Sequence, residues 1–90
     1  MPIIRVPSLV KYYLDGQAEI RLTGQTVGEV LQVLVREFPK IQSHILDNNS
    51  QLRRHINLFV NSDHIRDLKN LETQVSESDV IKIVPSVTGG

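Results

Sequence analysis

Residues 80–84 read Val-Ile-Lys-Ile-Val, followed by Pro85, and form the most strongly β-branched stretch of the sequence. β-Branched residues favour strands, and a proline ends or borders them. Because strand side chains alternate between two faces, Ile81 and Ile83 share one face while Lys82 and Val84 share the other. The stretch therefore predicts a final strand with its two isoleucines in the core and with Lys82 and Val84 facing solvent.

Two further strands are expected near the amino terminus. Residues 3–10 read Ile-Ile-Arg-Val-Pro-Ser-Leu-Val, and residues 18–22 alternate apolar and charged side chains. Asp15-Gly16 between them is a strong turn dipeptide, so the two segments are predicted to pair as a β-hairpin. Pro7 lacks a backbone donor, which favours an edge position or a bulge at that point.

A helix is predicted from Thr26 to Phe38. Thr26 can cap its first amides, Glu29 stands where a capping box places its carboxylate, and Pro39 closes the element. Apolar residues recur at helical spacing and make one stripe: Val27, Val30, Leu31, Leu34 and Phe38. A further short helical turn is indicated by Ile41, Ile45 and Leu46.

The remaining stretch before the final strand holds one more predicted strand, over residues 55–61. Ile56, Leu58 and Val60 share one face of it, and Phe59 lies on the other. Residues 47–50 are polar and indicate a loop. Residues 62–79 are mixed, with four apolar anchors: Ile65, Leu68, Leu71 and Val75.

The order strand, strand, helix, strand, irregular segment, strand predicts an α+β layer pair. The helix supplies the long crossover that a parallel pair needs, so the final strand is expected to run parallel to the first. That arrangement is the β-grasp, ubiquitin-like fold, a mixed sheet of four to five strands with one main helix. We expect the β-grasp domain over residues 1–85 and a flexible Gly-Gly tail over residues 86–90.

Composition excludes several functional classes. Ten Lys and Arg residues balance ten Asp and Glu residues, so no basic field favours a nucleic acid partner. The sequence has no cysteine, which excludes disulfides, thiolate metal sites and a cysteine nucleophile. No apolar run approaches the roughly 20 residues of a membrane span, and the first residues lack a signal-peptide pattern. We therefore expect a cytoplasmic protein with no membrane partner.

No catalytic or metal site is visible in the sequence. His44, His55 and His64 match no zinc spacing. Ser62-Asp63-His64 contains the residue types of a catalytic triad, but consecutive turn residues do not usually converge as nucleophile, base and orienting group. Arg53-Arg54 reads as a solvated basic pair. We expect no catalytic residue, no metal and no bound cofactor.

The carboxyl terminus is the most informative feature, because the sequence ends at Gly89-Gly90 directly after the final strand. Backbone without Cβ atoms can thread a narrow channel, and residues 85–90 span roughly 20 Å when extended. Val87, Thr88 and Gly89 are expected to form a threading tail that presents the carboxylate of Gly90. An ionised carboxylate is a poor acyl electrophile, so it needs activation, most simply as an acyl-adenylate made by a partner enzyme.

The segment from Asp79 to Gly90 resembles the ubiquitin-like sulfur carrier proteins of the ThiS/MoaD family. It joins an acidic residue, an apolar strand and the pattern Pro-x-Val-x-Gly-Gly, and residues 26–30 and 58–61 add support. Residues 59–66 look most like the carrier that serves a cysteine-synthase-type enzyme. One departure is Ser78, where the family commonly has a glycine.

The resemblance implies a sulfur carrier that is not itself an enzyme. A partner similar to ubiquitin-activating enzymes would adenylate Gly90 with ATP and magnesium, and a sulfur donor would convert the adenylate to a thiocarboxylate. The thiocarboxylate would then donate sulfur to an acceptor on a synthase, in the cysteine branch with later trimming by a metalloprotease. Two alternatives stay open: the small subunit of molybdopterin synthase, and a ubiquitin-like modifier conjugated through Gly90. A third, a passive β-grasp interaction module, is disfavoured by the Gly-Gly terminus.

A docking patch is predicted on the open face of the sheet, made of Pro7, Phe59, Lys82 and Val84. Alternation places these residues opposite the helix, and an exposed aromatic beside β-branched residues is typical of a partner site. The alternative is that Phe59 packs under residues 62–75. The family resemblance favours docking, because β-grasp carriers bind partners through this face.

Overall fold

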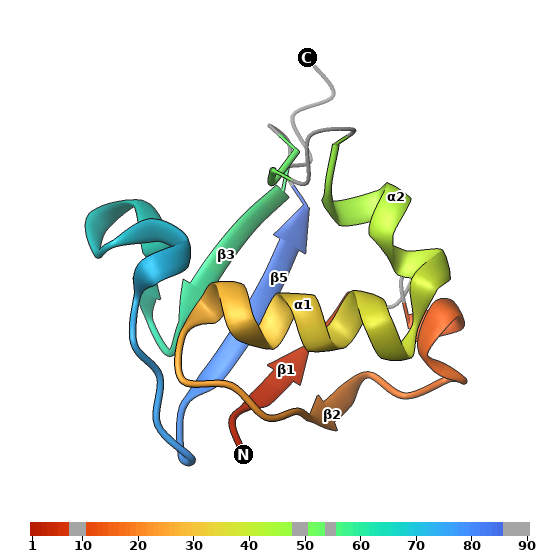
Figure 1. The fold of residues 1–90 in the computed structure, drawn as a ribbon, viewed down its shortest axis with the longest axis horizontal. Helices are drawn as coiled ribbons and strands as arrows, with labels where there is room; N and C mark the ends of the chain where they lie inside the picture. Colours follow the sequence, from red (N-terminus) through yellow and green to blue (C-terminus); the bar gives the residue numbers. More distant parts are fainter. Residues whose placement is uncertain (8–10, 48–50, 54–55, 86–90) are drawn as a thin grey trace.

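The computed structural model describes residues 1–7, 11–47, 51–53 and 56–85. These residues form a five-stranded sheet in the order β2-β1-β5-β3-β4, with helix α1 lying across one of its faces (Figure 1). The strands are β1 (Ile3–Arg5), β2 (Glu19–Arg21), β3 (Ile56–Val60), β4 (Asp63–His64) and β5 (Val80–Pro85). The predicted mixed sheet with one main helix is confirmed.

The final strand β5 occupies the centre of this sheet. It pairs in parallel with β1, with Ile4 opposite Ile81, and antiparallel with β3, with Leu58 opposite Ile83. The predicted parallel pairing of the last and first strands is thus confirmed. β5 runs through Pro85, which pairs with Ile56, so the strand ends at the proline as predicted.

Helix α1 (Val27–Glu37) begins and ends where its caps predict. The Thr26 hydroxyl accepts a hydrogen bond from the Glu29 backbone at 3.2 Å, and the Glu29 carboxylate accepts one from the Gln25 backbone at 3.0 Å. The capping-box carboxylate therefore reaches one residue further back than the usual arrangement. At the other end, the amide of Phe38 donates to the Leu34 carbonyl before Pro39.

The core lies between α1 and the sheet. Helix α1 buries Val27, Val30, Leu31 and Leu34 against it. A 3₁₀-helix η2 (Pro39–Ile41) and the short helix α2 (Gln42–Ile45) close one end, with Ile41 and Ile45 almost fully buried. The predicted short turn is therefore present. The sheet contributes the largest set of buried side chains: Ile4, Ile20, Ile56, Leu58, Val60, Ile81 and Ile83.

The predicted antiparallel pairing of the two amino-terminal strands is confirmed, because β1 pairs with β2, but the predicted tight turn and the length of the first strand are wrong. β1 ends at Arg5, residues 8–10 lie outside the described residues, and a 3₁₀-helix η1 (Lys11–Leu14) stands between β1 and β2. The reason is the core, because Leu14 is fully buried there. Asp15 and Gly16 both adopt positive φ, 56° and 83°, and they reverse the chain after η1 rather than inside a two-residue hairpin loop.

The irregular segment before β5 contains more structure than its sequence indicates. The two-residue strand β4 pairs with the end of β3, and two 3₁₀-helices follow, η3 (Ile65–Asp67) and η4 (Asn70–Glu72). Ile65 is buried, whereas Leu68 is 40% exposed, so the assignment of Leu68 as an apolar anchor is wrong. Leu68 caps η3 outside the helical conformation, with φ −114° and ψ −127°.

None of the helices in the described segments is long and apolar enough to cross a bilayer. The tail predicted over residues 86–90 lies outside the described residues, as do Arg54 and His55.

Candidate functional site

The face of the sheet opposite α1 carries a row of side chains that crosses all five strands. The strand registers align them in the order Glu19, Arg5, Lys82, Phe59 and His64. Because alternate residues of a strand share a face, Val84 and Asn57 lie one step further along the same face. Alternation along β5, with Ile81 and Ile83 buried, thus places Lys82 and Val84 as predicted.

The charged side chains of this row differ in whether they form an ion pair. Arg5 holds Glu19 through two nitrogen atoms, Nε and Nη2, each 3.1 Å from the same carboxylate oxygen. Lys82 has no ion-pair partner within the described part of the chain. Its cross-strand neighbour on β1 is Arg5, another cation. Lys82 therefore presents a positive charge that an acidic partner group can pair with.

Phe59 is half-buried, because His64 covers one side of its ring. The two ring centroids lie 5.0 Å apart in an edge-to-face arrangement. The Arg66 amide donates to Nδ1 of His64 at 3.0 Å, so the imidazole proton resides on Nε2, which donates to the Asn57 side chain at 3.0 Å. These two bonds fix the His64 ring against Phe59.

Pro7, Lys82 and Val84 line a shallow apolar hollow beside this row. Val84 is 40% exposed, which is unusual for a large apolar side chain on a central strand. All four residues of the predicted docking patch therefore lie on the same face. The expectation of a freely exposed Phe59 needs correction, since His64 of the segment after β3 covers part of it. The result lies between the two alternatives that the sequence left open.

The structure adds residues to this face that sequence reasoning missed, namely Arg5, Glu19 and His64. Alternation from Pro7 back to Arg5 indicates the first of these. The others depend on strand registers, and β4 in particular leaves no recognisable pattern in two residues.

The two ends of β5 differ in how they are held. At its start, Asn61 donates from Nδ2 to Asp79 at 3.0 Å and accepts from the Val80 amide at 3.1 Å. The other Asp79 oxygen accepts from the Ser76 amide at 2.8 Å. These hydrogen bonds, with Ser76 contributing most and Asn61 next, hold the pKa of Asp79 below its ordinary value. The turn before β5 is thus closed by Asp79 and Asn61, with Ser78 at the position where the resemblance predicts a glycine.

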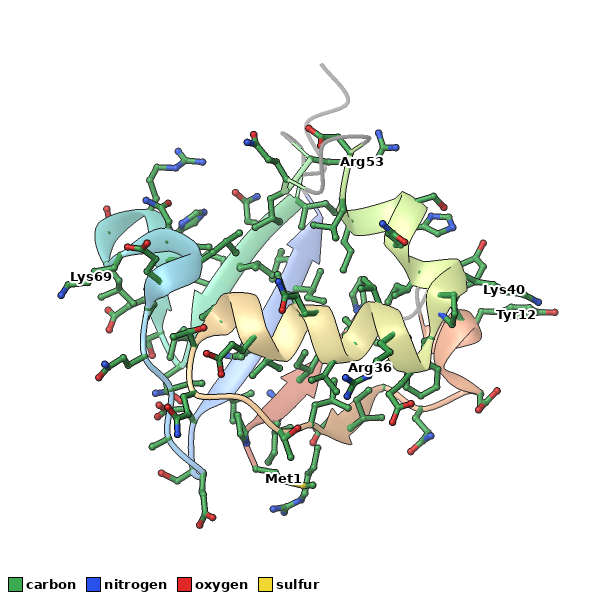
Figure 2. All side chains as sticks on the ribbon, viewed as in Figure 1. Met1, Tyr12, Arg36, Lys40, Arg53 and Lys69 are labelled. Atoms are coloured by element: carbon green, nitrogen blue, oxygen red, sulfur yellow. The ribbon has the colours of Figure 1, made fainter. Side chains whose placement is uncertain are left out.

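At its carboxyl end, β5 runs to Pro85, opposite Ile56 at the start of β3. The predicted carrier residue Gly90 and the tail residues Val87, Thr88 and Gly89 lie outside the described residues. Figure 2 shows Arg53 at this end of the molecule, where its Nε donates to the Ser43 carbonyl at 2.8 Å. The described part of the chain therefore ends on the central strand of the sheet.

The histidine and carboxylate side chains of the described residues do not gather in any group of three that could hold a metal ion. His44 packs on the Tyr13 ring, with centroids 4.4 Å apart. Both ring nitrogens of His64 are engaged by Asn57 and Arg66, so within Ser62-Asp63-His64 the imidazole is not directed at the serine as a base.

Comparison with known proteins gives a consistent picture. A family model described as the ThiS family matches residues 10–90. The sulfur carrier protein CysO of Mycobacterium tuberculosis H37Rv is 28% identical over 89 residues, which covers 97% of this chain and 96% of that protein. A crystal structure of M. tuberculosis CysO superposes with a TM-score of 0.87. It is 26% identical and covers 97% of this chain and 100% of its own.

Two further solved structures are similar over nearly the whole chain. The Amycolatopsis orientalis BexX/CysO complex contains a chain with a TM-score of 0.88 at 27% identity, and both chains are fully covered. The small archaeal modifier protein 1 of Methanosarcina acetivorans has a TM-score of 0.84 at 32% identity, covering 98% of this chain and 94% of that one. The predicted β-grasp fold is confirmed by these superpositions.

Proposed function

The chain belongs to the ThiS family, and on this premise we propose that it is a sulfur carrier protein whose Gly90 is loaded as a C-terminal thiocarboxylate. The observation that carries the proposal is the family match, which extends through Gly89-Gly90. The fold supports it, because the strand that precedes the tail is held by neighbours on both sides. The tail can therefore enter a partner enzyme without loosening the sheet. The chain acts as a co-substrate rather than as a catalyst.

The proposed loading has two steps. In the first, the Gly90 carboxylate attacks the α-phosphorus of ATP, held with magnesium by an activating enzyme, and pyrophosphate leaves. In the second, a donor at the oxidation level of sulfide attacks the acyl carbon, forming a carbon–sulfur bond while AMP departs. No thiol of the carrier competes for the activated acyl group, because the sequence contains no cysteine.

Partner enzymes are proposed to bind the docking patch, Pro7, Phe59, Lys82 and Val84. The half-exposed Phe59 and the exposed Val84 supply apolar area, and Lys82 beside them supplies a charge that no ion pair of the described residues neutralises. Interfaces commonly combine such an apolar centre with charges that set orientation. The Amycolatopsis orientalis CysO forms a complex with BexX, and we propose a comparable complex for this chain.

The sulfur acceptor that we propose is an activated serine derivative on a cysteine-synthase-type enzyme. The thiocarboxylate sulfur displaces the leaving group on the β-carbon and forms a thioester. The amino group of the new cysteine can then take over the acyl group as an amide, which a metalloprotease would hydrolyse. The whole-length similarity to CysO favours this branch.

A second candidate function is protein modification, with Gly90 joined to lysine amines by an isopeptide bond. The observation that favours it is the similarity to the small archaeal modifier protein 1, at 32% identity. The two functions share the adenylated intermediate and differ only in the nucleophile that follows.

The deciding experiment is the intact mass of the protein purified from its native host under non-hydrolysing conditions, before and after treatment with a thiol-selective alkylating reagent. We expect a species heavier than the encoded chain by the difference between one sulfur and one oxygen atom. It should gain one alkyl group, located at Gly90 by fragmentation. Because the chain has no cysteine, this reaction is specific for acquired sulfur.

The matched control is the protein lacking Gly90, which should melt at the same temperature and acquire no sulfur. Finding only carboxylate in cells with active sulfur metabolism would contradict the carrier function. Higher-mass conjugates that disappear with Gly90 would instead support the modifier function.

A further inference from the structure

Strand β2 forms one edge of the sheet, and no strand of the described residues pairs with its outer side. On the inner side, the Val6 amide donates to the Ala18 carbonyl at 2.8 Å and the Leu22 amide donates to the Pro2 carbonyl at 3.1 Å. Even-numbered residues of this stretch therefore direct their backbone groups toward β1. In an antiparallel pair the direction alternates, so Glu19 and Arg21 direct theirs outward.

An edge strand with outward backbone groups is a template for another strand, and proteins usually block it with charges. The charges on β2 do not block every partner. The strand reads Glu19-Ile20-Arg21, with opposite charges at the two outward positions. When a second copy runs antiparallel, its Arg21 faces Glu19 and its Glu19 faces Arg21, so the two strands have complementary charges.

We propose that two copies of this chain associate through β2 about a two-fold axis at Ile20, forming one continuous ten-stranded sheet. Glu19 of each copy lies opposite Arg21 of the other, and the two Ile20 residues lie opposite each other. The outward amides and carbonyls of the two charged residues then make four hydrogen bonds across the axis.

Charge selects this register over its neighbours. Outward-facing groups can only pair with outward-facing groups, so the copy can shift only in steps of two residues. A shift in one direction sets Glu19 opposite Glu19, and a shift in the other sets Arg21 opposite Arg21. Like charges directly opposite are destabilising, whereas the register centred on Ile20 has two complementary pairs.

Both faces of β2 suit this partner. On the open face, Arg5 already holds Glu19, so the incoming Arg21 completes a chain of alternating charges. On the helix side, a hollow of about 700 Å³ runs between β2 and the end of α1, with Ile20, Leu22 and Phe38 among its lining residues. An isoleucine from a second copy adds apolar contact there.

Such a dimer leaves the carrier function accessible. β5 is separated from β2 by β1, which places it roughly 10 Å from the edge at about 4.8 Å per strand spacing. Phe59 and His64 lie still further away, on β3 and β4. Each copy therefore keeps its own docking patch and its own carboxyl end.

The test is sedimentation analysis of the full chain over a wide range of protein concentrations. We expect a reversible dimer. Amide hydrogen exchange at Glu19 and Arg21 should become slower as the dimeric fraction rises with protein concentration. Glu19→Arg and Arg21→Glu, each alone, replace both complementary pairs with like charges and should raise the dissociation constant at least about tenfold. The double variant Glu19→Arg/Arg21→Glu should restore dimerisation.

A mixture of the two single variants is the sharpest control, because each repels itself and complements the other. We expect a heterodimer, distinguished by mass when one variant is isotopically labelled. Glu72→Arg, which changes the charge by the same amount in η4, should leave the dimer unaffected. Melting temperatures of the single variants check that they fold.

Three outcomes overturn the inference. The first is a wild-type monomer at every concentration. The second is a dimer that persists in both folded single variants, which would place the interface elsewhere. The third is failure of the folded double variant and of the mixture to associate, which would exclude this register.

Discussion

Replacing Asn61 with glycine is expected to lower the free energy of unfolding by about 2 kcal/mol, although Asn61 is exposed and lies outside the core. Asn61 adopts φ of 57°, in the left-handed region that glycine enters without strain. The substitution therefore keeps the backbone turn after β3 and removes only the side chain. That side chain joins this turn to the start of β5 through Asp79 and Val80.

The magnitude follows from the two bonds that are lost. The bond to the Asp79 carboxylate is charge-assisted but solvent-exposed, so we take about 1 kcal/mol, below the usual range for charged partners. The bond from the Val80 amide contributes about 0.5–1 kcal/mol. Glycine also adds about 0.5 kcal/mol of entropy to the unfolded chain. For a domain of this size, a total of about 2 kcal/mol lowers the melting temperature by roughly 10 °C.

The pH dependence of the free energy of unfolding provides an independent check on the contact between Asn61 and Asp79. The pKa of Asp79 is lowered in the folded protein from its ordinary value of 3.8 by hydrogen bonds from Ser76 and Asn61. The unfolded chain therefore takes up a proton first as the pH falls. The stabilisation is fully present above the unfolded pKa and is lost as the pH drops through the lower folded pKa. Asp79→Asn should remove this contribution and flatten the loss of stability in acid.

The assay is urea unfolding followed by circular dichroism, at neutral pH and in steps down to about pH 2. Asn61→Gly and Asp79→Asn are measured singly and together. Because the two residues share one hydrogen bond, the double variant should lose less free energy of unfolding than the sum of the two single losses. A loss below about 0.5 kcal/mol for Asn61→Gly, or full additivity of the pair, would refute this reasoning. The reasoning would also be refuted if the free energy of unfolding of Asp79→Asn fell with decreasing pH as steeply as that of the wild-type chain.

Substitutions at three further positions test other parts of the molecule. Gly24→Ala should cost more than about 2 kcal/mol in urea unfolding, because φ is 153° and an added Cβ would lie 2.5 Å from a Val30 methyl carbon. Thr26→Ala removes the N-cap of α1 and should cost about 1 kcal/mol, whereas Thr26→Ser should cost little. Lys82→Glu should keep or raise the melting temperature, because Arg5 gains an opposite charge across the strand. It should slow adenylation by the activating enzyme about tenfold, because the proposed docking patch loses its positive charge. An unchanged rate would contradict the role of Lys82 in docking.

Helix α1 and strand β5 were predictable because each is specified locally. Thr26 and Pro39 mark the ends of the helix, and its apolar residues recur at one period. β5 is β-branched on both faces, and the isoleucines on one face alternate with Lys82 and Val84 on the other. The alternation also placed the residues of the proposed docking patch on one face, since side-chain direction in a strand follows from parity alone.

The elements that were not predictable depend on contacts distant in sequence. β1 stops at Arg5, and the following η1 exists to bury Leu14 under the helical layer. β4 consists of two residues and is a strand only because β3 lies beside it. The partial burial of Phe59 has the same origin, because His64 returns across β3 through that short pairing.

The clasp at the start of β5, formed by Asn61 and Asp79, connects stability to the proposed function. A strand that slips by one residue exchanges its two faces, so such a slip would bury Lys82 and expose Ile81 and Ile83. The clasp holds β5 at its first residue, immediately before the pairings that place Ile81 in the core. Its two polar side chains lie outside the docking patch, yet they oppose the slip that would destroy it. A variant of the clasp should therefore lose partner binding only in proportion to the fraction of molecules that unfold or slip, because the register is all that the clasp contributes.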